Sequence, residues 1–174
     1  DPARLDIKHK NLKVFSGDVL DESSVEKSIK GKDAVLSALG AKSLKKTNVV
    51  SEGTKNIIEA MEKHKVKRLV FESAFGVGES RKNAGLLGIV DNIAIKNIFA
   101  DKVRQEEYIK KSKLNWIIVR PAALTNGPKK GFYRTGEDIK IRFFASISRA
   151  DVADFMLKQL YQDKYIRKSP TICY

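Results

Sequence analysis

Two polar residues, Asp18 and Ser73, each follow a short apolar run that ends in turn residues. Asp18 lies within residues 15–21 (FSGDVLD), and Ser73 comes shortly after residues 68–71 (RLVF). In open α/β sheets, ligands bind in the crevice beyond the carboxyl ends of the strands. We therefore expect both side chains to reach one crevice, where Asp18 receives a ligand and Ser73 hydrogen-bonds a carboxamide or a substrate oxygen. A serine that only closes a strand is the alternative for Ser73.

Several common catalytic arrangements are missing from the sequence. None of the tyrosines is followed four residues later by a lysine, the pair through which mainstream short-chain dehydrogenases move a proton. His9 and His64 are isolated, and the single cysteine, Cys173, has no companion at ligand spacing, so we predict no metal site. Ser73 lacks the flanking glycines of a hydrolase nucleophile elbow. The mainstream dehydrogenase mechanism, metal chemistry and triad hydrolysis are therefore not predicted.

A glycine-rich turn between a strand and a helix can hold a pyrophosphate through backbone N–H groups. The nearest pattern contains Gly76 and Gly78, but Arg81 stands where a third glycine belongs, and no amphipathic helix follows at once. We interpret this pattern as a chance match. A pyrophosphate cradle is then either absent or lies upstream of Asp1.

The composition favours one domain with a positively charged surface. A chain of 174 residues can bury a real core without disulfides. The formal charge of +13 invites a nucleic-acid interpretation, but the lysines form small groups along the whole chain, and no basic stripe alternates with aromatic residues. We interpret the lysines as a solubilising surface, with binding of an anionic ligand such as a dinucleotide as the second possibility.

No segment predicts a membrane span or a secretion signal. The longest uninterrupted apolar stretch, residues 84–90, is far shorter than the ~20 residues that cross a bilayer. A single cysteine suits a reducing compartment. We expect a cytoplasmic monomer or weak homodimer that acts on a small-molecule substrate, without a membrane or nucleic-acid partner.

The predicted strands and helices, which position the polar residues, alternate along the chain. Short β-branched runs predict buried strands at residues 12–15, 34–38, 68–71 and 116–119. Apolar residues at a 3.6-residue period predict helices over residues 22–30, 48–64 and 94–111, and a fourth helix opens at the capping box of residues 148–151. Such alternation predicts a Rossmann-like, doubly wound, mostly parallel sheet in a three-layer α/β/α domain spanning residues 1–174. Residues 76–92 form either a substrate loop or an ordinary surface excursion.

Taken in order, several short segments resemble the atypical short-chain dehydrogenase/reductase group. This group of NAD(P)H-binding proteins includes biliverdin reductase B, also called flavin reductase, and NmrA-like proteins. The matching segments cover most of the chain and are Gly17–Leu20, Asp33–Val35, Leu39-Gly40, Ser51–Gly53, Asn56-Ile57, Ala60-Met61, Ser73–Phe75, Arg120-Pro121 and Ile147–Leu157. No single segment is specific, but their order and spacing together are.

The resemblance implies a set of cofactor-binding residues. At the adenosine end it implies that Asp18 and Val19 contact the adenine, that Leu39, Gly40 and Lys42 run along the cofactor, and that Arg4 lies near the adenosine phosphate. At the nicotinamide end it implies Ser73, Ala74, Phe75, Pro121, Ala122 and Ala123. The expected cofactor is NADP, with NAD possible, and Ser73 is the expected catalytic residue.

The resemblance also implies that the family's first strand, glycine-rich turn, first helix and second strand precede Asp1, so that the domain is N-terminally incomplete. The leading expectation is an NAD(P)H-dependent oxidoreductase that passes hydride to a small planar acceptor, as flavin and biliverdin reductases do. The alternative is a redox-sensing regulator of the NmrA-like kind, which binds NAD(P) without turning it over. Nucleic-acid binding through the positive surface is a third possibility.

Overall fold

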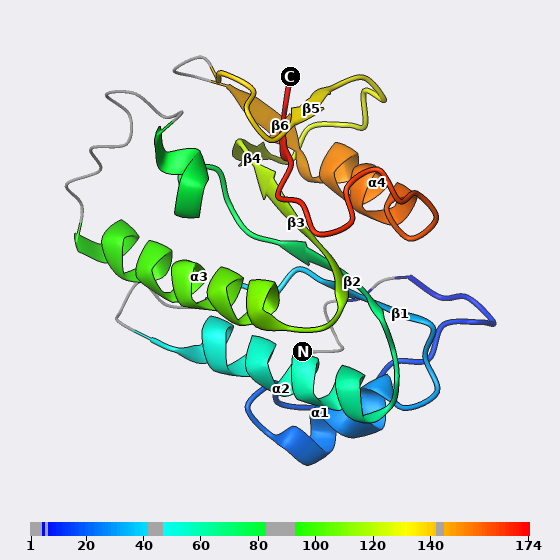
Figure 1. Ribbon diagram of the computed structural model, residues 1–174. Coiled ribbons are helices and arrows are strands. Elements are labelled where there is room, and N and C mark those ends of the chain that lie inside the picture. Colours follow the sequence, from blue (N-terminus) through cyan, green and yellow to red (C-terminus); the bar gives the residue numbers. More distant parts are fainter. Residues whose placement is uncertain (1–4, 6, 42–46, 83–92, 142–144) are drawn as a thin grey trace.

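The computed structural model describes residue 5 and residues 7–41, 47–82, 93–141 and 145–174. Helices and strands alternate through most of this part of the chain (Figure 1). The elements in chain order are α1 (Glu22–Ile29), β1 (Ala34–Ser37), α2 (Val49–Lys63), β2 (Arg68–Glu72), α3 (Ile93–Lys111), β3 (Asn115–Pro121), β4 (Ala123–Thr125), β5 (Arg134–Gly136), β6 (Ser146–Ser148), α4 (Arg149–Lys158) and β7 (Thr171–Cys173).

The main sheet has the strand order β1-β2-β3-β7-β5. β1, β2, β3 and β7 are parallel, and β5 pairs with β7 in the antiparallel direction. A second, two-stranded sheet joins β4 to β6. The mostly parallel sheet expected from the sequence is confirmed. The strands β4 to β7 were not predicted.

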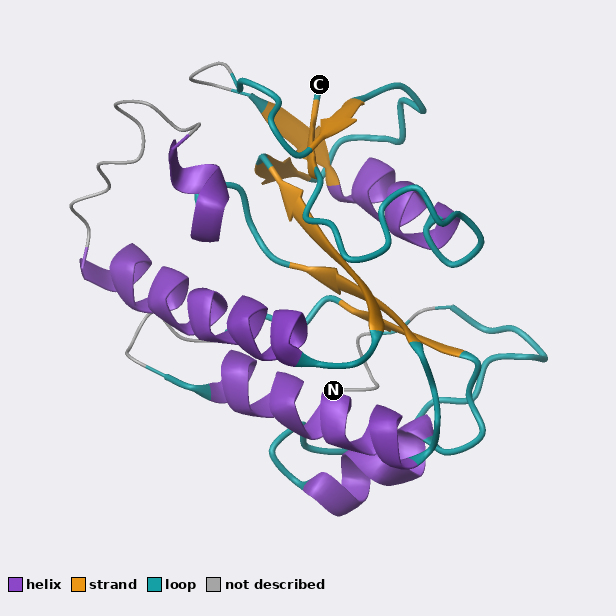
Figure 2. Cartoon of the chain, in the orientation of Figure 1, coloured by secondary structure: helices purple, strands orange, loops and turns teal. Residues whose placement is uncertain are grey.

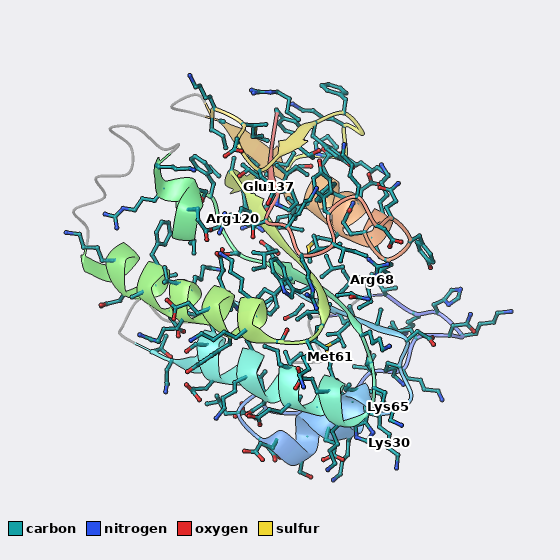
Figure 3. The ribbon with its side chains drawn as sticks, in the orientation of Figure 1. Lys30, Met61, Lys65, Arg68, Arg120 and Glu137 are labelled. Carbon is teal, nitrogen blue, oxygen red and sulfur yellow. The ribbon has the colours of Figure 1, made fainter. Side chains whose placement is uncertain are left out.

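Helices cover both faces of the sheet (Figure 2). On one face the strands contribute Leu69, Phe71 and Ile118 to a core shared with α1, α2 and α3, and Met61 of α2, labelled in Figure 3, is fully buried there. On the other face, Val70 packs with side chains of α4. Alternate strand residues thus point to opposite cores. Burial on both faces explains why the strand sequences are continuously apolar.

Local signals in the sequence place the ends of two helices. At α1, the Asp21 carboxylate accepts a hydrogen bond from Ser23 N, and Gly31, with a φ of 72°, follows the last turn. At α4, the Ser148 hydroxyl accepts from Asp151 N at 3.1 Å, which confirms the predicted start of that helix.

The start of α2 is instead held by a distant side chain. Its N-cap residue, Asn48, makes no side-chain cap bond. The buried carboxylate of Asp101, on α3, accepts hydrogen bonds from Val50 N at 3.0 Å and Ser51 N at 3.3 Å. These bonds satisfy amide donors that the first turn of a helix leaves free. The cap therefore joins α2 to α3.

The strand predicted at residues 12–15 is wrong. The structure places these residues in an exposed segment without strand pairing, and Leu12, Val14 and Phe15 are 40%, 52% and 58% exposed. A strand needs a neighbour to pair its backbone groups. Within the described residues, β1 pairs with β2 alone, so no strand lies between β1 and this segment to provide that pairing.

In the described part of the chain, no helix is long and apolar enough to span a membrane. Residues 83–92, which make up much of the irregular stretch predicted as a substrate loop or surface excursion, lie outside the described residues.

Candidate functional site

The segments after β2 and β3 lie side by side at the carboxyl edge of the sheet. Ser73 N donates to the carbonyl oxygen of Val119 at 2.8 Å, and Phe75 N donates to that of Pro121 at 2.9 Å. Ala122 N then donates to Ile172 O at 3.0 Å. Residues predicted separately at the ends of two strands are therefore brought together, with Ala74 between Ser73 and Phe75 and the exposed Ala123 after Ala122.

The Ser73 hydroxyl is buried without a hydrogen-bond partner. The residue is 3% exposed, and its Oγ contacts no donor or acceptor in the described residues. An unsatisfied buried polar group costs about 1–3 kcal/mol. The hydrogen-bonding capacity of this hydroxyl is therefore unused among the described residues.

Two charged residues that sequence reasoning missed accompany Ser73. Lys102 Nζ, on α3, donates to the carbonyl oxygen of Ser73 at 3.4 Å. Burial lowers the pKa of Lys102 below its usual range, against the opposing effect of nearby carboxylates. Burial also raises the pKa of Glu72, and the positive charges of Lys102 and Arg149 oppose that rise. One signal was present: Lys102 lies four residues after Ile98, on the apolar side of its helix.

A second group of predicted residues lines a pocket beside the end of β1. Asp18, Val19, Leu39 and Gly40 border a cavity of about 470 Å³. Its other lining residues are Gly17, Leu20, Ala41, Thr47 and Val49. The pocket thus collects four of the residues expected at the adenosine end, although it does not include Ser73 or Pro121.

Close packing against α2 fixes the walls of this pocket. A Cβ on Gly53 would lie 2.6 Å from a methyl group of Val19 and 3.1 Å from one of Leu39. Glycine at this position lets the helix approach both loops. Asn56, one turn later, donates through Nδ2 to Val19 O at 3.0 Å. The carboxylate of Asp18 is exposed, and one of its oxygens accepts from Leu20 N at 2.9 Å.

Two of the predicted residues, Arg4 and Lys42, lie outside the described residues. The structure therefore places ten of the twelve predicted site residues: four in the pocket beside β1, and six in the paired segments after β2 and β3.

The paired glycines after β2 have a structural explanation. Gly76 and Gly78 both have positive φ angles, of 90° and 55°. A Cβ on Gly78 would lie 2.8 Å from Arg120 Nη2 and 2.9 Å from Glu106 Oε2. Position 78 requires glycine because its φ is positive and because a side chain would collide with the ion pair of Arg120 and Glu106. This agrees with the interpretation of the pattern as a chance match to a phosphate loop.

Arg120 ties the loop after β2 to α3. The residue is 3% exposed, belongs to β3 and is labelled in Figure 3. Its Nε donates to Glu106 Oε1 at 3.0 Å, and its Nη2 donates to Glu79 Oε2 at 2.6 Å. Hydrogen bonds from Lys110 and Arg120 lower the pKa of Glu79 to about 2. This network holds the loop that follows Ser73.

A family model described as NAD(P)H-binding matches residues 1–163. The chain belongs to this NAD(P)H-binding family. An uncharacterised chloroplastic protein of Arabidopsis thaliana is 34% identical over 118 residues, which are 64% of this chain and 40% of that protein. The chain thus spans less than half the length of this curated relative.

Solved structures share the fold. The oxidoreductase ylbE of Lactococcus lactis has a TM-score of 0.78 at 25% identity, covering 95% of this chain and 73% of that chain. ChuY, an anaerobilin reductase of Escherichia coli, has a TM-score of 0.79 at 20% identity, covering 93% and 75%. A short-chain dehydrogenase/reductase of Veillonella parvula in complex with NADP has a TM-score of 0.71 at 18% identity, covering 94% and 73%. The Rossmann-like fold and the resemblance to NAD(P)H-binding proteins of this type are confirmed.

Proposed function

We propose that this protein is an NAD(P)H-dependent oxidoreductase that passes hydride to a small planar acceptor of the flavin or bilin type. The observation that carries the proposal is the orphaned Ser73 hydroxyl at the carboxyl edge of the sheet, in a family that binds NAD(P)H. The similarity to an anaerobilin reductase favours a planar acceptor of that kind. The carboxamide of the cofactor or an oxygen of the acceptor would satisfy the hydroxyl.

The residues present fit two parts of a dinucleotide. The pocket lined by Asp18, Val19, Leu39 and Gly40 offers a cavity of about 470 Å³ and an exposed carboxylate that could accept hydrogen bonds from the adenosine end. The segments around Ser73 would hold the nicotinamide end. We propose NADP as the cofactor, with Arg4 and Lys42 available to its adenosine phosphate. When bound, the reduced cofactor supplies the hydride.

The chain's own groups would orient the reactants rather than perform covalent chemistry. Hydride transfer needs alignment of donor and acceptor, and positioning alone supplies much of such a rate. Pro121 and Ala122 are buried, and Pro121 is paired with the segment that contains Ser73, so the residues nearest this segment at the end of β3 are small and apolar. The positive charge of Lys102, held at the Ser73 carbonyl oxygen, would stabilise negative charge that develops on the acceptor.

Equilibrium binding and turnover together test this proposal. NADPH and NADH are titrated into the full chain, and loss of reduced-nicotinamide absorbance is then followed with FMN, riboflavin, biliverdin and quinones as acceptors. We expect NADPH to bind more tightly than NADH, and at least one planar acceptor to be reduced. Absence of binding to a polypeptide that also carries the pyrophosphate cradle proposed below would refute the proposal.

A second candidate is a regulator that binds NAD(P) without turnover. It is favoured by the absence of the tyrosine–lysine pair of mainstream short-chain dehydrogenases. The residue four positions before Lys102 is Ile98, which has no hydroxyl group to relay a proton. NADPH binding without oxidation by any acceptor would support this alternative.

We further propose that the sheet continues beyond β1 in the complete domain. β1 has an open edge in the described part of the chain, beside a cavity of about 450 Å³. Two large apolar residues that line this cavity, Phe15 and Leu36, are exposed. A further strand, with the glycine-rich turn that follows it, would cover this surface and supply the pyrophosphate cradle. Slow hydrogen exchange of β1 amides in a longer polypeptide, compared with fast exchange in residues 1–174, would support this.

A further inference from the structure

A second cavity, separate from the pocket that contains Asp18, is lined mostly by charged residues. It has a volume of about 330 Å³, at the lower end of the range of small-molecule pockets. Its walls come from α3, from β3, and from the segments after β2, after β5 and before β7. We call it the Arg120 cavity, and its lining residues are Glu79, Lys82, Lys110, Trp116, Arg120, Glu137, Asp138, Arg167 and Ser169. It shares none of them with the pocket beside β1.

Trp116 and Arg120 are the residues that β3 contributes to this cavity. They lie four positions apart on one strand, so their side chains point to the same face of the sheet. Arg167 N donates to Trp116 O at 2.7 Å, and Ser169 N donates to Glu137 Oε1 at 3.1 Å. These bonds hold the segment before β7 against β3 and against Glu137, which Figure 3 labels together with Arg120.

Arg120 brings an unpaired part of a buried cation to the cavity wall. The residue is 3% exposed, and its Nε and Nη2 bind the carboxylates of Glu106 and Glu79. Its remaining nitrogen, Nη1, makes no hydrogen bond with any described residue, which leaves two N–H donors unused. A guanidinium group stays charged and favours hydrogen bonds to anionic oxygens. Such a group in the wall of a cavity favours an anionic ligand.

The other charged lining residues indicate an anion with a single charge. Arg167 and Lys82 add two cations whose side chains form no hydrogen bond or ion pair with any described residue. Glu137 and Asp138 line the same cavity and would repel a second negative charge. The remaining two charged lining residues form an ion pair with each other. A monocarboxylate is therefore better matched to this cavity than a dicarboxylate or a phosphate ester.

Glu137 and Asp138 also supply hydrogen-bond acceptors. One oxygen of Glu137 accepts from Ser169 N, whereas its second oxygen and both oxygens of Asp138 accept no hydrogen bond from any described residue. A ligand with an N–H or O–H group beside its carboxylate could therefore use both kinds of lining residue. Trp116, which is 8% exposed, supplies an apolar part of the wall.

We propose that the Arg120 cavity binds a small monocarboxylate that also carries a hydroxyl or ammonium group, of the α-hydroxy acid or α-amino acid class. Arg120, Arg167 and Lys82 hold its carboxylate, and Glu137 and Asp138 accept hydrogen bonds from its hydroxyl or ammonium group. This site does not depend on the proposed reductase function.

Trp116 gives a readout that belongs to this cavity, because it is the only tryptophan in the chain. L-lactate, L-alanine, acetate and inorganic phosphate are each titrated into the full chain at constant ionic strength, and binding is followed by tryptophan fluorescence and by calorimetry. We expect L-lactate or L-alanine to bind saturably with the same Kd by both methods. Acetate lacks the second polar group and should bind about fivefold more weakly, the effect of one neutral hydrogen bond. Phosphate should bind more weakly still.

Two variants test the site without disturbing the ion pairs of Arg120. Arg167→Gln and Lys82→Gln each remove a cation from the cavity wall, and Arg81→Gln is the matched control, since Arg81 is exposed and does not line the cavity. Arg167→Gln should raise the Kd about tenfold or more, as expected for a hydrogen bond to a charged group. Lys82→Gln should have a smaller effect because Lys82 is exposed. Arg81→Gln should change the Kd less than twofold, and all thermal midpoints should stay close to that of the wild type.

Three results would overturn this assignment. The first is the absence of saturable binding of both L-lactate and L-alanine by either method. The second is an equal loss of affinity in Arg167→Gln and Arg81→Gln, which would indicate general attraction to a positively charged surface. The third is tighter binding of phosphate than of the carboxylates, which would exclude a monocarboxylate as the preferred ligand.

Discussion

Replacing Ser73 by alanine should stabilise the fold while weakening the binding of its ligand. The Ser73 hydroxyl is buried and unpartnered in the described residues, and such a group costs about 1–3 kcal/mol. Removing it should therefore raise the free energy of unfolding by about 1 kcal/mol. For a domain of this size, that corresponds to a rise in thermal midpoint of roughly 2–4 °C.

Binding should change in the opposite direction. If the hydroxyl hydrogen-bonds the nicotinamide carboxamide or the acceptor, its loss removes one neutral hydrogen bond, about 1 kcal/mol. This is roughly a fivefold increase in the Kd of NADPH or the KM of the acceptor. Thermal unfolding and equilibrium titration of the same preparations measure the two effects.

Ser80→Ala is the matched control for this experiment. Ser80 is buried, but its hydroxyl accepts from Gly76 N at 2.9 Å and donates to Val77 O at 2.7 Å. Its removal should lower stability by about 1–2 kcal/mol, since it leaves partners unsatisfied. If Ser73→Ala destabilised the fold as much as the control and left binding unchanged, the assignment of Ser73 to a ligand site would be refuted.

Three further changes test other parts of the site. Asp18→Ala should weaken NADPH binding by about 1 kcal/mol in equilibrium titrations, and an unchanged Kd would remove Asp18 from the site. Because the pKa of Glu79 is lowered from 4.5 to about 2, its stabilising contribution is complete above pH 4.5 and is lost as pH falls toward 2; Glu79→Gln should reduce this acid sensitivity in unfolding curves. Gly78→Ala should destabilise the fold by about 1–3 kcal/mol in denaturant titrations, because its Cβ would press on Arg120 and Glu106 at a positive φ; near-wild-type stability would contradict this packing argument.

The parallel sheet could be predicted because its signals are local. Continuous β-branched runs mark strands buried on both faces, and the 3.6-residue period marks the helices between them. The run at residues 12–15 has the same local composition, yet it forms no strand. A strand forms only beside a neighbouring strand, and the sequence of the run does not show whether one is present. The three-residue strands β4 to β7 were missed for the converse reason, since their partners define them more than their own sequences do.

The candidate site could be predicted only in part for a similar reason. The end of β2 locates Ser73, because residues after parallel strands lie at the carboxyl edge of the sheet. Asp18 lines the pocket beside β1, although the strand predicted before it is absent from the described residues. Lys102 and Asp101 act across elements, on groups 29 and 51 residues away in the chain. No short motif records such contacts. A charged residue on the apolar side of a helix was the available signal.

Neighbouring residues of α3 reach toward both ends of the proposed cofactor. Asp101 binds the first amides of α2, next to Val49 in the wall of the pocket that holds Asp18, and Lys102 binds the carbonyl oxygen of Ser73. One turn of α3 therefore links the start of α2, beside that pocket, to the segment that contains Ser73, so a movement of α3 would shift both places together.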